Sequence, residues 1–168
     1  MKFRTGQHAV YPGCGVGKVD EIQTMNGADM YVISFPDNKT RVWVPTKNAK
    51  TLGLRHLMTN ATLRKALSKI PEQQAPHKTV TWNRRFKVYD EKIQTNQPEA
   101  IAEVLGELSA IQREKTLTFG EKRIFRQVYA LFTREGALVR EIDEDTFSSE
   151  LKGWLEKTAP NTRQPKQP

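Results

Sequence analysis

The hydrophobic pattern of this chain changes its period near residue 57, and this change limits the folds that the chain can adopt. Before that point, apolar and β-branched residues alternate with polar ones in four short runs: QHAVYP, GVGKVDEIQT, MYVISFP and TRVWVP. Alternation with a period of two is typical of strands that bury one face. Turn-forming pairs separate the runs at Asn26-Gly27 and Asp37-Asn38, and an Asn-Gly pair favours a tight hairpin. This segment is therefore predicted to contain four or five short strands.

From about residue 59 the apolar residues recur at helical spacing instead. Pro71 ends the first such segment, and Pro98 suits the first turn of a later one. Thr118 and Glu121 form the T-x-x-E pattern of a helix capping box. The apolar stripes comprise Leu63, Leu67 and Ile70; Ile101, Val104, Leu105, Leu108 and Ile111; Ile124, Phe125, Val128, Leu131 and Phe132; and Phe147, Leu151, Trp154 and Leu155.

Together the two periods predict an α+β protein, in which an N-terminal Tudor/SH3-like small β-barrel is followed by a C-terminal all-α helical bundle. We expect the barrel in residues 1–57 and a joining helix with a polar, proline-containing linker in 58–78. The bundle, of about four helices, should occupy residues 79–158. The segment 159–168 is polar and proline-rich, which predicts a disordered tail.

The charge balance favours a polyanionic partner. The formal net charge is +8 and the sequence pI is about 9.7, and such a balance is typical of proteins that bind nucleic acid or anionic membranes. The positive charge is concentrated in residues 58–92. No apolar run is long enough to span a membrane, and the N-terminus lacks the apolar region of a signal peptide. With Cys14 as the only cysteine, an intramolecular disulfide is impossible, and we expect a cytoplasmic protein.

The sequence contains no pattern that indicates catalysis. The glycines of residues 13–17 lack the spacing of a dinucleotide fingerprint, and a strand-like run follows them instead of a helix. Cys14 and His8 do not by themselves make an activated nucleophile, and the four ligands of a zinc site are missing. Carboxylates such as Glu121 stand beside Lys or Arg, as on a solvated helix face. We therefore expect no enzyme activity, no cofactor and no metal.

In TWNRRFKVYDEKI a tryptophan is followed closely by three cations, Arg84, Arg85 and Lys87. If this segment is a helix, Trp82 lies at its start, and Arg84 and Lys87 are neighbours on one face. Cations contact phosphates, and an apolar wedge beside them can enter a base step from the minor groove. The alternative is that Trp82 packs between helices while the cations face water, which is the more usual fate of a tryptophan.

Five blocks resemble the CarD/CdnL family of bacterial transcription regulators. They are FRTGQHAVYPGCGVGKVDEI, RVWVP, LGLRHL, TWNRRFKVYDEKIQTNQPEAIAEVLGEL and LTFGEKRIF, and they run in order from about residue 3 to residue 140. The most specific parts are the VYP-GxG opening, the W-x-R-R-F-K block and the L-T-x-x-E-K-R block. The first implication of the resemblance is an N-terminal Tudor-like domain that docks on the RNA polymerase β subunit.

The resemblance also assigns roles to residues. It implies a helical domain that binds promoter DNA at the upstream edge of the transcription bubble, where Trp82 wedges into the minor groove. Arg84 and Lys87 would contact phosphates, and Arg85 would be structural or assist them. The polymerase contact falls on Arg41, Val42 and Trp43, and Trp43 stands where some relatives carry arginine. The alternative for Trp43 is a half-buried position on the barrel surface.

We therefore expect a non-enzymatic transcription regulator that stabilises the open promoter complex. Its partners would be the RNA polymerase β subunit and the minor groove and phosphates of promoter DNA. The length fits the small stand-alone CdnL type, and we expect a monomer that associates with the nucleoid. The alternative is a general, non-sequence-specific DNA- or RNA-binding protein that does not depend on RNA polymerase.

Overall fold

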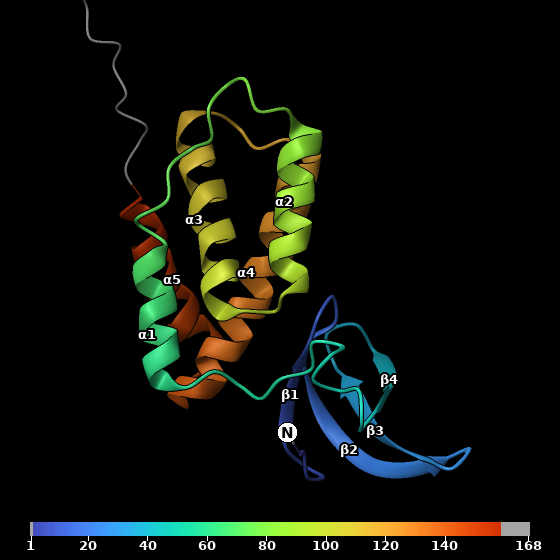
Figure 1. The fold of residues 1–168 in the computed structure, drawn as a ribbon. Helices are drawn as coiled ribbons and strands as arrows, with labels where there is room; N and C mark the ends of the chain where they lie inside the picture. Colours follow the sequence, from blue (N-terminus) through green and yellow to red (C-terminus); the bar gives the residue numbers. More distant parts are fainter. Residues whose placement is uncertain (1, 159–168) are drawn as a thin grey trace, which may run out of the picture.

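The structure, a computed structural model, describes residues 2–158 and divides them into an N-terminal sheet and a C-terminal set of helices (Figure 1). The predicted α+β class is confirmed. The strands are β1 (His8–Tyr11), β2 (Gly15–Met25), β3 (Ala28–Phe35) and β4 (Thr40–Pro45). The helices are α1 (Asn60–Lys69), α2 (Trp82–Gln94), α3 (Pro98–Glu114), α4 (Phe119–Arg140) and α5 (Glu144–Glu156).

The sheet is an antiparallel meander in the order β1-β2-β3-β4. Asn26 and Gly27 join β2 to β3, with φ angles of 49° and 77°. Positive φ at both central positions is what a type I′ hairpin requires, which explains the Asn-Gly pair. One face of the sheet is buried over a small core of its own, formed by Phe3, Ala9, Val19, Tyr31, Ile33, Phe35, Val44, Ala49 and Leu54. β4 is the outermost strand on its side of the sheet.

Local signals fix where the helices begin and end. Pro98 is the first residue of α3, where its missing N–H removes no helical hydrogen bond. Thr118 and Glu121 complete the capping box of α4, as predicted. Asp143 caps α5 by accepting a hydrogen bond from the Thr146 backbone at 2.8 Å.

Helix α1 is part of the helical core. The sequence pattern predicted a joining helix here, because the segment is short and a proline-containing linker follows it. In the structure Leu63, Leu67 and Ile70 are buried in the same apolar cluster as residues of α3, α4 and α5. Figure 1 shows α1 and α2 on opposite sides of α3.

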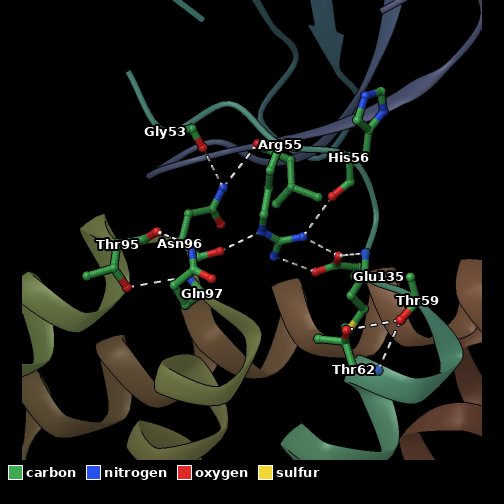
Figure 2. Close-up of polar contacts among 11 residues, drawn as sticks. Gly53, Arg55, His56, Thr59, Thr62, Thr95, Asn96, Gln97 and Glu135 are labelled. Carbon is green, nitrogen blue, oxygen red and sulfur yellow. Dashed lines mark hydrogen bonds and ion pairs between the residues drawn. The ribbon is translucent and has the colours of Figure 1, made fainter. Parts of the chain in front are cut away.

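A buried polar interface joins the sheet to the helices (Figure 2). Arg55, just after the sheet, donates to both carboxylate oxygens of Glu135 on α4, with an Nη2–Oε2 distance of 2.9 Å. Glu135 also accepts a hydrogen bond from the Met58 backbone at 2.8 Å. Asn96, after α2, donates to the backbone oxygens of Val10 and Gly53, both at 3.0 Å. These bonds fix α2 and α4 relative to the sheet.

Candidate nucleic-acid interface

Trp82 is the first residue of α2. Figure 1 shows that α2 begins at the end of the helical part that is farther from the sheet. The Trp82 indole packs against Gly120 at the start of α4. A Cβ atom at Gly120 would lie only 2.5 Å from the indole Cζ2, so the glycine is what allows this approach. The ring is half-buried and contacts the helical core. Trp82 therefore combines the two arrangements considered from the sequence, since one side is packed and the other is open.

The open side of Trp82 faces a groove between α2 and α4. The groove has a volume of about 380 Å³. Phe86 of α2 lies beside Trp82, with ring centroids 5.6 Å apart. Phe119, the first residue of α4, is 81% exposed. The lining residues are Trp82, Asn83, Phe86, Asp90, Ile93, Phe119, Gly120, Arg123, Ile124 and Gln127.

Arg85 does not share the exposed face of α2 with the other two predicted phosphate contacts. Its side chain is only 11% exposed, and its guanidinium donates to Glu121 of α4 at 2.8 Å. The same guanidinium lies 5.6 Å from the centroid of the Trp82 ring. Because Glu121 already binds this cation, Arg85 is placed to position the indole. Of the two roles considered for Arg85, this geometry fits the structural role.

Glu121 is a fully buried carboxylate with two separate tasks. It accepts a hydrogen bond from the Thr118 backbone at 2.8 Å, which caps α4, and it binds Arg85. Burial alone would raise the pKa of Glu121. The bonds from Thr118 and Arg85 outweigh burial, so the pKa is lowered and the carboxylate stays ionised. The start of α4 and the start of α2 are thereby tied together beside Trp82.

Exposed cations stand on both helices that border the groove. Arg84 and Lys87 are exposed on α2, as the sequence predicted. Lys122, Arg123 and Arg126 are exposed on α4. The cations of α4 were not among the predicted contacts, because a charged run on a helix more often marks a solvated face. Phe119 was not predicted either, since its place directly after the N-cap threonine does not tell whether its ring is exposed.

The basic segment 58–92 is not one patch. Lys69 binds Glu72 at 2.9 Å, and Lys92 binds Glu103 at 2.8 Å. Lys65 of α1 lies 3.6 Å from Glu99. Figure 1 shows α1 and α2 on opposite sides of α3. Among the residues that line the groove the cation is Arg123 of α4, and Arg84 and Lys87 are exposed elsewhere on α2.

The three residues predicted to contact the polymerase divide between two faces of β4. Trp43 is 43% exposed, and its indole N–H donates to Gln23 at 3.2 Å. Arg41 is exposed on the same face and binds Asp20 at 3.1 Å. Val42 points the other way and packs against the core of the sheet. A protein partner on this face would meet the side chains of Arg41 and Trp43 but only the backbone of Val42.

Residues 2–158 contain no group of three or more His, Cys, Asp or Glu side chains placed to hold a metal ion. Within the same residues, no helix is both long enough and apolar enough to cross a membrane.

Two family models match the chain in succession. A model of the CarD-like/TRCF RID domain matches residues 3–58, and a model of the CarD C-terminal domain matches residues 65–152. The Bacillus subtilis (strain 168) protein named "Putative transcription factor YdeB" is 25% identical over 151 residues, which cover 88% of this chain and 98% of that protein. These matches confirm the resemblance found in the sequence blocks. The chain belongs to the CarD-like family of transcription regulators.

Proposed function

We propose that this regulator stabilises the open promoter complex by binding RNA polymerase through β4 and by inserting Trp82 into the DNA minor groove at the upstream edge of the bubble. It performs no chemical reaction. The observation that carries the proposal is the setting of Trp82: a half-buried indole at the far end of the helices, with exposed cations on both neighbouring helices.

The DNA contact rests on charge and on a rigid wedge. Arg84 and Lys87 on α2, with Arg123 on α4, offer exposed cations on both helices that form the groove. Phosphate contacts of this kind position a protein on DNA without reading the base sequence. A wedge that unstacks a base step costs about a few kcal/mol, which further contacts to the bent DNA offset. The packing of Trp82 against Gly120 supports it as such a wedge, because the ring is held before DNA arrives.

The polymerase contact rests on the free side of the sheet. β4 is an outermost strand, so its outer edge can pair with an extended segment of a partner. Trp43 offers a large exposed ring beside that edge, and tryptophan is enriched among residues that dominate binding energy. The match of residues 3–58 to the CarD-like/TRCF RID domain supports the polymerase β subunit as the partner.

Trp82→Ala tests the wedge. Wild-type protein is expected to lengthen the lifetime of open complexes after competitor addition, about tenfold if it favours the open state by about 1.4 kcal/mol. The variant should return the lifetime to that of polymerase alone, because the cations remain but the wedge is gone. The measurement uses the cognate RNA polymerase, and thermal unfolding checks that the variant is folded.

Arg64→Ala is the matched control for Trp82→Ala. Arg64 is an exposed cation of α1, on the other side of α3 from the groove, and its loss should leave the lifetime unchanged. An equal extension by wild type and Trp82→Ala would show that Trp82 serves only packing and would place the effect in the cations or the polymerase contact.

The second candidate function is a general nucleic-acid-binding protein, which the exposed cations of α2 and α4 favour because they need no polymerase. Trp43→Ala separates the two. If β4 docks on the polymerase, this change should weaken binding to the polymerase at least about tenfold, as expected for an interface anchor. Binding to free DNA should stay unchanged, since β4 lies in the sheet, away from the end at which α2 begins (Figure 1).

Leu52→Ala is the control for this comparison, because Leu52 is another exposed apolar side chain of the N-terminal part. If wild-type protein showed no affinity for the polymerase, or if Trp43→Ala bound it as tightly as wild type, docking through this face would be excluded.

A further inference from the structure

Phe119 is exposed far beyond what packing explains. It is the most exposed large apolar side chain among residues 2–158, at 81%, although it opens a long helix whose other large apolar residues are buried or half-buried. A phenylalanine ring that stays in water does not contribute the favourable free energy that its burial would give to folding. The ring stands at the mouth of the groove that Trp82 and Phe86 also line. Three aromatic rings therefore border one open space.

Besides the aromatic rings, the groove is lined by four polar side chains and by Ile93, Ile124 and Gly120. Asn83 and Gln127 present amide groups, each of which can donate and accept hydrogen bonds. Arg123 contributes a positive charge, and Asp90 a negative one. The volume of about 380 Å³ lies in the range of sites for small planar ligands, which is about 300–1,000 Å³. Aromatic walls with amide groups suit a flat, hydrogen-bonding ring.

We propose that the groove between α2 and α4 holds one unpaired nucleobase, stacked on Phe119, from the DNA strand that Trp82 wedges open. This inference rests on the proposed function and names what the wedge displaces. Stacking on aromatic side chains is a general way to hold unpaired bases without reading their identity. A base that leaves the duplex stack loses its stacking partners, and Phe119 supplies a new one beside the point of unstacking.

Charge favours a nucleic-acid occupant over a protein segment. Arg123 lines the groove, and Arg84, Lys87 and Lys122 are exposed on the two helices that form it, so these cations complement the phosphates of a strand. Asp90 would repel a phosphate. We therefore expect the edge of the base, and not the DNA backbone, to lie beside Asp90. An acidic peptide would meet the same repulsion without gaining the stacking.

Forked DNA tests the proposal. The full chain is titrated, at low salt, with a duplex that ends in unpaired strands and with a blunt duplex of equal length, and affinity is read by fluorescence anisotropy. Wild type should prefer the fork about tenfold, a size expected for one stacked base. Phe119→Ala should lose this preference and keep the affinity for blunt DNA, because the phosphate contacts are intact. Ile142→Ala, which removes an exposed apolar side chain elsewhere, should behave as wild type.

An abasic residue at the first unpaired position identifies the stacked group. It should weaken wild-type binding to the fork as much as Phe119→Ala does, and should not weaken the variant further. Equal affinity of wild type for fork and blunt DNA, or additive effects of the abasic residue and Phe119→Ala, would overturn the proposal. If Phe119→Ala left DNA binding intact but abolished the effect on open-complex lifetime, the groove would hold a segment of the polymerase instead.

This test is separate from that of the wedge. The fork preference is measured without polymerase, so it can be present even if wild type fails to lengthen the open-complex lifetime. Conversely, a lifetime that depends on Trp82 but not on Phe119 would keep the proposed function and remove the base site.

Discussion

Glu135→Ala is expected to lower the free energy of unfolding by about 3–5 kcal/mol, the usual effect of removing one partner of a buried ion pair. Glu135 is 1% exposed and binds both Arg55 and the Met58 backbone. Without it, the Arg55 guanidinium keeps only backbone oxygens as partners, and a buried N–H loses its acceptor. Urea unfolding followed by circular dichroism measures the change.

Asp37→Ala is the matched control for this prediction. Asp37 and Arg134 also join the sheet to α4, but Asp37 is 51% exposed. Exposed ion pairs contribute about 0–1 kcal/mol, so this loss should be small. If both variants lost less than about 1 kcal/mol, the buried pair would not hold the two parts together.

The same interface sets the distance between the two proposed binding surfaces. Helix α2 has 13 residues and so spans about 20 Å. Trp82 is its first residue, and the hydrogen bonds of Asn96 to the N-terminal part lie just beyond its last residue. A rigid connection holds the wedge at one position relative to the bound polymerase. A mobile connection spreads it over many positions and lowers its effective concentration at the DNA. Glu135→Ala should therefore also shorten the open-complex lifetime, even though Glu135 contacts neither partner.

Those features of the fold that depend on neighbouring residues could be predicted from the sequence. The Asn26-Gly27 hairpin needs only two residues that tolerate positive φ. The start of α3 at Pro98 and the capping box of α4 are likewise set within one helical turn. The position of Trp82 as the first residue of α2 follows from the polar run before it and the periodic segment after it.

Features that depend on packing between distant segments could not be predicted in this way. Arg85 and Glu121 are 36 residues apart, and each has a sensible local interpretation as an exposed charge on its own helix. Only the packing of α2 against α4 brings them together and pairs Arg85 with Glu121. The exposure of Phe119 is also a tertiary property, because a phenylalanine at a helix start gives no sign of whether another helix covers it.

Glu121→Ala is expected to lower the free energy of unfolding by about 3–5 kcal/mol and to release Trp82. The change leaves the Arg85 cation, which is 11% exposed, without its carboxylate and leaves the Thr118 backbone N–H without its acceptor. Because Arg85 lies against the indole, the ring loses one of its supports. Tryptophan fluorescence anisotropy should fall, and the open-complex lifetime should shorten even where the protein remains folded.

The pH dependence of stability distinguishes Glu121 from an ordinary surface carboxylate. Its pKa is lowered in the folded protein from the ordinary value of 4.5, so the stabilisation is present above pH 4.5 and is lost as the pH falls toward the folded value. Wild type should therefore lose stability below pH 4.5 more steeply than Glu121→Ala in urea unfolding. Glu150→Ala removes a half-exposed partner of Arg140 and should cost under about 1 kcal/mol, with the acid sensitivity of wild type retained. Parallel acid profiles for wild type and Glu121→Ala would mean that the Thr118 and Arg85 bonds do not hold this carboxylate in its ionised form.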